Sequence, residues 1–283
     1  MEMRPLGSSG LWVSALGLGT VKIGRRRGLK YPGAQVGTAG LLSPGGSEPA
    51  PLPTDEQVLA LLRCARDEEI NLIDTAPAYG VAEQRLGEVL ARADWLGGRD
   101  RWVLTTKVGE EFDDQDARSS FHFTPEHARM SVERSLRRLR TDHVDAVLVH
   151  SDGRDGWIIE SSGVLEALAE LAHKGLTRCI GISIKSVEGG LLAVQRLSRF
   201  APQAPGVVMV TYNPEQTGER PVIDAAARHG VGVLVKKGLS SGHAADARGS
   251  IRFVLSHPGV SSLVIGTTSP SHLEANARAS RAL

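Results

Sequence analysis

The chain contains 283 residues, of which 41% are hydrophobic and 23% are charged, and this composition is ordinary for a globular protein. That length fits either two average domains or one large α/β barrel. The net charge of +1 gives no sign of a nucleic acid or an anionic membrane as a partner, and no apolar run approaches the ~18 residues of a transmembrane helix.

The first fifty residues contain one short apolar run between two segments of different character. Residues 1–14 include Gly7 and Gly10 between semi-apolar pieces, which predicts a small β-hairpin. The apolar run 15–20 follows, and residues 21–53 are then rich in Gly, Pro and Ser. A segment of that length without a helix pattern is typical of a functional lid or a disordered loop.

Short apolar runs rich in Val, Ile and Leu recur along the whole chain and alternate with amphipathic stretches. Runs of this kind are typical of strands that are buried on both faces, as in a parallel sheet. We predict eight strands, at residues 15–20, 71–76, 101–108, 144–150, 177–183, 206–213, 231–238 and 261–267.

Helix signals lie between the predicted strands. Thr54 and Gln57 have the spacing of a capping box, and Thr124 precedes a proline in the first helical position. Ser269 and Pro270 repeat the second arrangement near the C-terminus. Other helical patterns occupy residues 81–93, 160–174, 186–198, 219–229 and 249–257.

Eight strand-then-helix units favour a closed (β/α)8 TIM barrel of the α/β class over a doubly wound sheet. An open sheet would usually carry a GxGxxG turn that begins a helix, whereas Gly17-Leu18-Gly19 leads into a segment without a helix pattern. We find no internal repeat and predict a single domain over residues 1–283.

Reactive side chains fall at the carboxyl ends of several predicted strands, where barrel enzymes hold their active sites. Asp74 ends the second strand, Lys107 the third and His150 the fourth, and Tyr79 lies in the short loop after the second strand. Other polar or glycine positions at later strand ends are Ser183, Lys236, Lys237, Gly266, Thr267 and Thr268.

Taken singly, each of these residues also fits a structural polar role, but together they suggest proton chemistry. A carboxylate at Asp74 would hold the Lys107 ammonium in its charged form. That ammonium, close to Tyr79, would lower the phenol pKa from its usual value of ~10. A histidine nearby, His150, would orient a substrate oxygen. The set predicts a proton donor aimed at a carbonyl, with a hydride that must come from a cofactor.

The loops after the last two strands suit a phosphate group. Gly266, Thr267 and Thr268 lead directly into the predicted helix after Ser269, whose first amides would bind an anion. Lys236 and Lys237 add positive charge at the same barrel mouth. Either a dinucleotide or a sugar phosphate fits this location.

These motifs resemble the aldo-keto reductase superfamily, and the resemblance covers essentially the whole chain. LGLGT is similar to the family's first strand, NLIDTAPAYGVAEQRLGEVL to its Asp–Tyr segment and TTKVG to its lysine strand. SVERSLRRLRTDHVDAVLVH resembles the helix and strand that carry the histidine, GLTRCIGIS the fifth strand, and IGTTSPSHLEAN the C-terminal cofactor loop and helix.

The resemblance implies NAD(P)H-dependent reduction of a small aldehyde or ketone without a metal. It makes Tyr79 the general acid, tuned by Asp74 and Lys107, and gives His150 the task of orienting the carbonyl. It also implies a cofactor site that holds the nicotinamide at Gly19, Thr20 and Ser183. The adenosine phosphate and adenine would lie along residues 266–276. The candidate contacts in that segment are Gly266, Thr267, Thr268, His272 and Asn276.

Several positions depart from the family's pattern. Ile184 stands where asparagine is usual, Met209 where a carboxamide-binding glutamine is usual, and Lys236 where many members stack an aromatic ring on the nicotinamide. His272 replaces an arginine that many members use on the 2′-phosphate. We expect NADPH over NADH, because His272 or Thr267 would still serve that phosphate.

Three other readings of the chain stay open at this point. The same chemistry run backwards gives a sugar or alcohol dehydrogenase. The altered nicotinamide contacts also fit a cofactor-sensing protein without catalysis, and Lys107 or Lys236 would serve a Schiff-base enzyme. Residue types in loops 21–53, 109–123 and 151–159 would decide the substrate.

The remaining features yield weaker expectations. The acidic run 110–116 is predicted to be a solvated loop after the third strand rather than a calcium site. The long loop after the first strand carries Arg25, Arg26 and Arg27. These arginines either close over cofactor phosphates or keep that loop soluble. The N-terminus lacks the apolar core of a signal peptide, and two distant cysteines suggest a reduced compartment. We therefore expect a cytoplasmic protein, a monomer by resemblance, without metal, nucleic acid or membrane partners.

Overall fold

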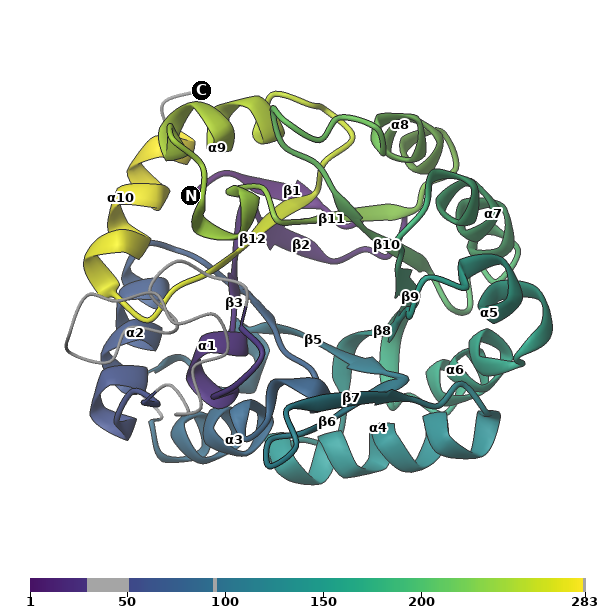
Figure 1. The fold of residues 1–283 in the computed structure, drawn as a ribbon, viewed down its shortest axis with the longest axis horizontal. Coiled ribbons are helices and arrows are strands. Elements are labelled where there is room, and N and C mark those ends of the chain that lie inside the picture. Colours follow the sequence, from purple (N-terminus) through teal and green to yellow (C-terminus); the bar gives the residue numbers. More distant parts are fainter. Residues whose placement is uncertain (30–50, 94–95, 282–283) are drawn as a thin grey trace.

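Eight parallel strands close into a barrel at the centre of the computed structural model, which describes residues 1–29, 51–93 and 96–281 (Figure 1). The order around the barrel is β10-β11-β12-β3-β4-β5-β8-β9, so every strand neighbours the next barrel strand along the chain. The bounds are β3 (Leu16–Gly19), β4 (Leu72–Asp74), β5 (Val103–Val108), β8 (Val144–His150), β9 (Thr177–Ser183), β10 (Gly206–Thr211), β11 (Gly232–Lys236) and β12 (Ser262–Gly266). The predicted barrel and its eight strands are confirmed.

Helices surround the barrel and bury an apolar face against it (Figure 1). The capping box of the first long helix is present, because Gln57 N donates to Thr54 Oγ1 over 3.3 Å and Thr54 N donates to Gln57 Oε1 over 2.8 Å. The bounds are α2 (Asp55–Asp67), α3 (Ala82–Arg92), α4 (Pro125–Leu139), α5 (Asp155–Ser161), α6 (Val164–His173), α7 (Val187–Ser198), α8 (Arg220–Arg228), α9 (Ala247–Leu255) and α10 (Pro270–Arg281). In the described residues, no helix is long and apolar enough to cross a membrane.

The single helix predicted over 160–174 is wrong, because α5 ends and α6 begins inside that range. Ser162 Oγ donates to Ile158 O over 2.7 Å and accepts from Val164 N over 3.2 Å, so one hydroxyl ends the first helix and begins the second. Gly163 between them has a positive φ of 73°, which a helix interior does not permit.

Two short elements were not predicted in the loops that follow the first and third barrel strands. Residues after β3 form one helical turn, α1 (Val21–Gly24), inside the predicted loop 21–53, and residues 30–50 of that loop lie outside the described residues. After β5 the chain forms an antiparallel hairpin of β6 (Glu110–Asp113) and β7 (Arg118–Phe121). The expectation of a plain solvated loop at 110–116 is therefore wrong.

The predicted N-terminal hairpin is confirmed and closes one end of the barrel. Strands β1 (Met3–Pro5) and β2 (Trp12–Ser14) pair antiparallel and lie across the barrel opening in Figure 1. Leu6 and Val13 from this hairpin are fully buried in one cluster with inward-facing barrel residues such as Leu72. Burial of this kind stabilises by ~25 cal/mol for each Å² of apolar surface removed from water.

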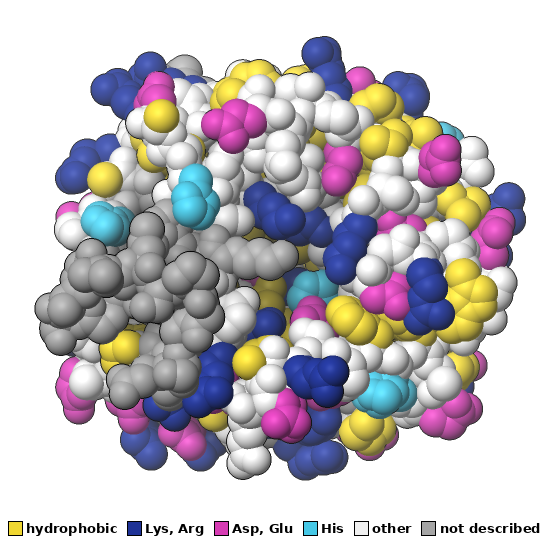
Figure 2. All heavy atoms as spheres, in the orientation of Figure 1, with side chains coloured by type: hydrophobic (Ala, Val, Ile, Leu, Met, Phe, Trp, Pro, Cys, Tyr) yellow, Lys and Arg dark blue, Asp and Glu magenta, His cyan; other side chains and the backbone are white. Residues whose placement is uncertain are grey.

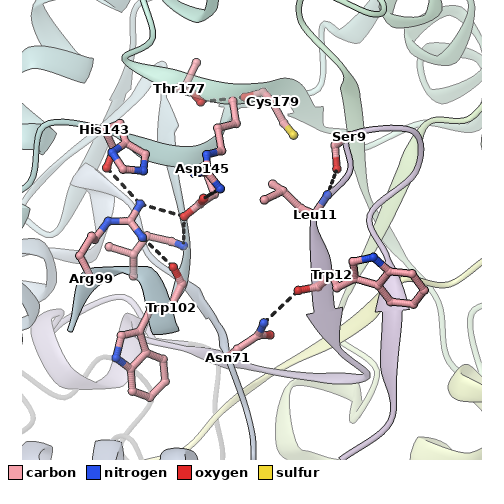
Figure 3. Close-up of polar contacts among 12 residues, drawn as sticks. Ser9, Leu11, Trp12, Asn71, Arg99, Trp102, His143, Asp145, Thr177 and Cys179 are labelled. Atoms are coloured by element: carbon pink, nitrogen blue, oxygen red, sulfur yellow. Dashed lines mark hydrogen bonds and ion pairs between the residues drawn. The ribbon is translucent and has the colours of Figure 1, made fainter. Parts of the chain in front are cut away.

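Polar contacts fix the same end of the barrel (Figure 3). Asp145 at the start of β8 is 2% exposed, and its Oδ2 accepts from Arg99 over 2.8 Å and from Leu104 N over 2.8 Å. Asn71, the residue before β4, donates from Nδ2 to Trp12 O over 2.9 Å and so joins the hairpin to the beginning of β4. With this end filled, the carboxyl ends of the strands are the open face of the barrel.

Candidate active site

A cavity of about 690 Å³ lies at the carboxyl ends of the strands. All eight barrel strands contribute residues to its wall, together with α1, the β6–β7 hairpin and the loop after β11. Figure 2 shows the mouth as a hollow bordered by Lys and Arg side chains. A volume of this order is within the range of small-molecule sites.

Asp74 and Lys107 form a buried ion pair at the floor of this cavity. Lys107 Nζ donates to Asp74 Oδ1 over 2.7 Å and to Oδ2 over 2.8 Å, and the two side chains are 1% and 4% exposed. Thr75 O accepts a third bond from Lys107 Nζ over 2.9 Å, and Thr105 Oγ1 donates to Asp74 Oδ1 over 2.9 Å. The carboxylate and the carbonyl together offset the burial of the ammonium charge.

Tyr79 stands beside this pair because a tight turn follows β4. The turn is the 3-10 helix η1 (Pro77–Tyr79), and Gly80 after it has a φ of 63°. A Cβ at Gly80 would lie 2.3 Å from Gly24 O, so only glycine fits between the tyrosine turn and α1. Lys107 Nζ lies 4.8 Å from the centroid of the Tyr79 ring.

His150 completes the group of four that the sequence singled out. Its ring centroid lies 6.3 Å from that of Tyr79, at an interplanar angle of 89°. The same cavity is lined by all four side chains, those of Asp74, Tyr79, Lys107 and His150. Residues that are up to 76 positions apart in sequence therefore meet at one point, because parallel strands present their carboxyl ends together.

Glu110 is a site residue that the sequence analysis missed. It begins β6, lines the cavity, and its Oε2 lies 2.8 Å from His150 Nδ1. Burial acts to raise the pKa of Glu110, but the His150 contact, the Ser119 hydroxyl and the Arg25 charge outweigh it and lower the pKa to about 2. Burial lowers the pKa of His150 below its ordinary value, and Glu110 opposes that shift. The acidic run 110–116 carried no sign of this contact, because only the hairpin brings its first residue over the barrel.

Lys236 occupies the position where the family resemblance implied an aromatic ring. Its Nζ donates to Ser183 Oγ over 2.8 Å and to Ile184 O over 2.6 Å. Burial lowers the pKa of Lys236 to about 8, while the charge of Glu219 acts in the opposite direction. Burial in turn raises the pKa of Glu219, whose Oε2 accepts from Thr211 N over 2.7 Å. Glu219 lines the cavity and was also missed, since nothing in its helix-start position indicates a site.

The predicted cofactor contacts divide into two groups. The first group lines the cavity and consists of Gly19, Thr20, Ser183, Met209, Lys236, Lys237 and Gly266. The second group lies outside that lining, toward α10, and consists of Thr267, Thr268, His272 and Asn276. At the beginning of α10, His272 N donates to Ser269 Oγ over 3.3 Å, and Ser269 N donates to Thr267 Oγ1 over 3.1 Å.

The donor set of this region fits a nicotinamide dinucleotide. Ser183 Oγ accepts from Lys236, which leaves the hydroxyl proton of Ser183 and a third ammonium proton of Lys236 for an acceptor in the cavity. Lys237 and the α10 N-terminus supply positive charge nearby, which suits phosphate.

Metal ligands do not gather in the described part of the chain, where no group of three or more His, Cys, Asp or Glu side chains has the arrangement of an ion site.

Asp155 joins two loops at the carboxyl ends of the strands. Its Oδ2 accepts from Lys185 N over 2.9 Å and from Ser186 N over 2.8 Å. This carboxylate therefore ties the loop after β8 to the loop after β9.

The closed barrel carries an Asp–Tyr–Lys–His group at its open end, and comparison of the sequence with known protein families shows which class has this arrangement. The sequence profile of the Aldo/keto reductase family matches residues 38–249. The chain belongs to the aldo/keto reductase family.

Curated relatives agree with this membership. Aldo-keto reductase YhdN of Bacillus subtilis is 31% identical over 193 residues, which cover 66% of this chain and 48% of that protein. L-galactose dehydrogenase of Arabidopsis thaliana is 32% identical over 185 residues, covering 65% and 48%. D-threo-aldose 1-dehydrogenase of a Pseudomonas species is 27% identical over 213 residues, covering 67% and 61%. The chain spans about half the length of the first two of these relatives.

Solved structures match over nearly the whole chain. A Pseudomonas aeruginosa protein assigned to the aldo-keto reductases is 44% identical with a TM-score of 0.81, covering 98% of this chain and 93% of that one. An aldo-keto reductase from Bacillus halodurans, solved in its holo form, is 23% identical with a TM-score of 0.73, covering 99% and 90%. The second match supports the fold alone.

Proposed function

We propose that this protein is a nicotinamide-dependent oxidoreductase that reduces a small aldehyde or ketone to the alcohol. The observation that supports this most directly is the contact of a buried Asp74–Lys107 ion pair with the ring of Tyr79. An ammonium held by a carboxylate at the floor of a cavity stabilises the phenolate that forms when Tyr79 gives up its proton.

Each member of the site has a separate task in this proposal. Tyr79 donates the proton to the carbonyl oxygen in the forward direction and takes it back in the reverse direction. Lys107 stabilises the tyrosinate, and Asp74 fixes Lys107. His150, whose ring lies edge-on to the Tyr79 ring, positions the substrate oxygens. In the described residues no side chain is a hydride donor, so this chemistry belongs to a cofactor.

The cofactor in this proposal is NADPH, with NADH as the alternative, and when bound it supplies the hydride. Ser183 and Lys236 would hold the nicotinamide carboxamide through their free protons. Lys237 and the beginning of α10, with Thr267, Thr268, His272 and Asn276, would hold the phosphates and adenine. Met209, Gly19, Thr20 and Gly266 would form the apolar and backbone walls of that pocket.

A second candidate function is the same reaction run as oxidation of a sugar or alcohol. Two of the relatives are named as sugar dehydrogenases, L-galactose dehydrogenase and D-threo-aldose 1-dehydrogenase. The residues are the same in both directions, because Tyr79 both gives and receives the proton. A cofactor-sensing protein without turnover remains the third reading, supported by Ile184 and Met209 in place of the usual polar contacts.

The test is a substrate panel followed by the absorbance of the reduced nicotinamide. Purified protein should oxidise NADPH with small aliphatic or aromatic aldehydes, or reduce NADP+ with aldoses. Titration of nucleotide fluorescence gives the dissociation constants of NADPH and NADH in the same buffer. Tight binding without turnover on any aldehyde, ketone, alcohol or aldose would support the sensing protein, and tighter binding of NADH would reverse the cofactor preference.

The remaining expectations are part of the same proposal. We propose a single domain over residues 1–283, a monomer in solution and a cytoplasmic location, with a small molecule rather than a nucleic acid, a membrane or a metal as the partner. Size-exclusion chromatography with light scattering checks the monomer, and limited proteolysis checks the single domain.

A further inference from the structure

The ammonium of Lys236 lies beside the reacting centre of the cavity. His150 and Ser183 are partners in the register of β8 and β9, so they lie side by side at the barrel mouth. Lys236 ends β11, and its Nζ reaches across β10 to donate to Ser183 Oγ over 2.8 Å. The charge of Lys236 also acts on His150 and lowers its pKa. A positive charge therefore lies at the depth where a substrate carbonyl would meet Tyr79 and His150.

Lys236 differs from the other buried lysine of the site in what balances its charge. Lys107 is paired with the Asp74 carboxylate over 2.7 Å. The two hydrogen-bond acceptors of Lys236 are neutral, the Ser183 hydroxyl and the Ile184 carbonyl. Among the described residues, no carboxylate forms an ion pair with Lys236. Its ammonium has a third proton, which it can donate into the cavity that it lines.

The charge of Lys236 depends on pH in a measurable range. Burial is the largest effect and lowers the pKa of Lys236 to about 8. Glu219 at the N-cap of α8 and Asp155 of α5 act to raise this pKa. Lys237 after β11 and Lys185 after β9 act to lower it. The side chain is therefore mostly charged at pH 7 and mostly neutral at pH 9.5.

Hydride transfer changes the charge of a nicotinamide. The reduced ring is neutral, and the loss of a hydride, one proton with two electrons, leaves a ring with a positive charge. In the reduced form the ring nitrogen also donates electron density to the carboxamide oxygen, which makes that oxygen a better acceptor. The reacting ring carbon must lie against the substrate carbonyl, and so at the depth of Lys236. An ammonium without a paired carboxylate attracts the reduced ring there and repels the oxidised one.

We propose that Lys236 makes the site bind the reduced nicotinamide more tightly than the oxidised one and so favours the reductive direction. This inference rests on the proposed function, because it takes a nicotinamide as a ligand of the cavity, and it adds a direction to that function. Lys236 is a specificity-determining residue, and Tyr79 and His150 keep their tasks at the carbonyl oxygen. The repelled oxidised cofactor leaves the site after each turnover.

The first test compares two nucleotides that differ only in the oxidation state of the nicotinamide. Titration calorimetry gives the dissociation constants of NADPH and NADP+ without substrate, at pH 7.0 and at pH 9.5. At pH 7.0 we expect a dissociation constant for NADP+ at least about tenfold larger than that for NADPH. At pH 9.5 the two should agree within about threefold, because Lys236 has lost its proton. Equal dissociation constants at pH 7.0, or a ratio that does not fall with pH, would overturn the proposal without any variant.

Proton release provides a second readout that a merely structural lysine would not change. A cationic ring lowers the pKa of Lys236 further, so NADP+ binding at pH 7.5 should release about half a proton or more. NADPH binding should release none from this group. Calorimetry in PIPES and in Tris, which differ in ionisation enthalpy, counts the protons. The absence of release with NADP+ would contradict the proposal.

Two lysine variants assign these effects to one side chain. Lys236→Met keeps the length of the side chain and removes its charge, so the NADP+ to NADPH ratio at pH 7.0 should fall at least about fivefold and lose its pH dependence. The matched control is Lys185→Met, at a lysine that also lines the cavity but lies 5.7 Å from the ring of Phe121. The control should keep the ratio within about twofold of the unmodified protein and keep the proton release. A full ratio in Lys236→Met would overturn the assignment.

Failure of this inference is distinguishable from failure of the proposed function. If no substrate is turned over but the two nucleotides bind with the expected ratio and proton release, then the oxidoreductase is wrong and the role of Lys236 stands. If substrates are turned over but NADPH and NADP+ bind equally, the oxidoreductase stands and the role of Lys236 is wrong. Absence of binding by either nucleotide would overturn both.

Discussion

The ion pair at the floor of the cavity gives the most informative stability experiment. Asp74 and Lys107 are almost fully buried and joined by two bonds of 2.7 and 2.8 Å. Asp74→Asn leaves the ammonium with the Thr75 carbonyl but without an opposite charge. Removal of one partner from a buried pair costs about 3–5 kcal/mol, a large share of the ~5–15 kcal/mol that holds a domain folded.

The double variant separates the charge effect from simple loss of contacts. Lys107→Met in the Asp74→Asn background removes the uncompensated charge, and buried pairs replaced on both sides by neutral groups are often close to neutral in stability. We therefore expect the double variant to recover most of the loss and to lie within about 2 kcal/mol of the unmodified protein. Urea denaturation followed by circular dichroism gives the four free energies of unfolding that the cycle needs.

A surface pair provides the control for this cycle. Arg140 and Glu88 lie 3.8 Å apart with side chains 50% and 41% exposed, so Glu88→Gln should cost at most about 1 kcal/mol. The reasoning about burial is refuted if Asp74→Asn costs no more than Glu88→Gln, or if the double variant is less stable than Asp74→Asn alone.

Two further predictions concern stability away from the ion pair. Lys236→Met should raise the free energy of unfolding at pH 7, because burial lowers the pKa of Lys236 from 10.5 to about 8 and so disfavours its charged form in the folded state. Between pH 8 and 10.5 the unfolded chain binds more protons at Lys236 than the folded protein does, so the unmodified protein gains stability as the pH rises and the advantage of methionine shrinks. Thermal unfolding of both proteins at pH 7 and pH 10 measures this change. A stability difference between the two proteins that is the same at both pH values would contradict the prediction. Thr54→Ala should lower the free energy of unfolding by about 1 kcal/mol through loss of the bond from Gln57 N, and a cost near zero in urea titration would show that the cap is not needed.

Sequence patterns predicted the barrel because its strands are short, apolar and buried on both faces. Residues 144–150 and 177–183 coincide with β8 and β9, and the capping box at Thr54 marks the beginning of α2. These features depend on neighbours along the chain, which is why a single sequence reveals them. The same reasoning placed Asp74, Lys107 and His150 at strand ends and Tyr79 in the loop after the second strand. The parallel register brings these strand ends together.

The missed features depend on contacts between distant segments. Glu110 belongs to an acidic run that looks like a solvated loop, and only pairing of β6 with β7 turns its carboxylate toward His150. Lys236 was expected beside a cofactor, but its bonds to Ser183 Oγ and the Ile184 carbonyl depend on the packing of β11 near β9. The break at Gly163 escaped because the apolar pattern continues across it.

The central claim is that Tyr79 exchanges the proton with the substrate oxygen, and Tyr79→Phe tests it most directly. The substitution removes one hydroxyl and keeps the ring that packs near Lys107 and His150. General acids contribute about 10²–10⁴-fold, so we predict that kcat on the best aldehyde of the panel falls at least ~100-fold while the dissociation constant of NADPH, measured by fluorescence, changes less than ~2-fold. A kcat within about threefold of the unmodified protein would contradict the account.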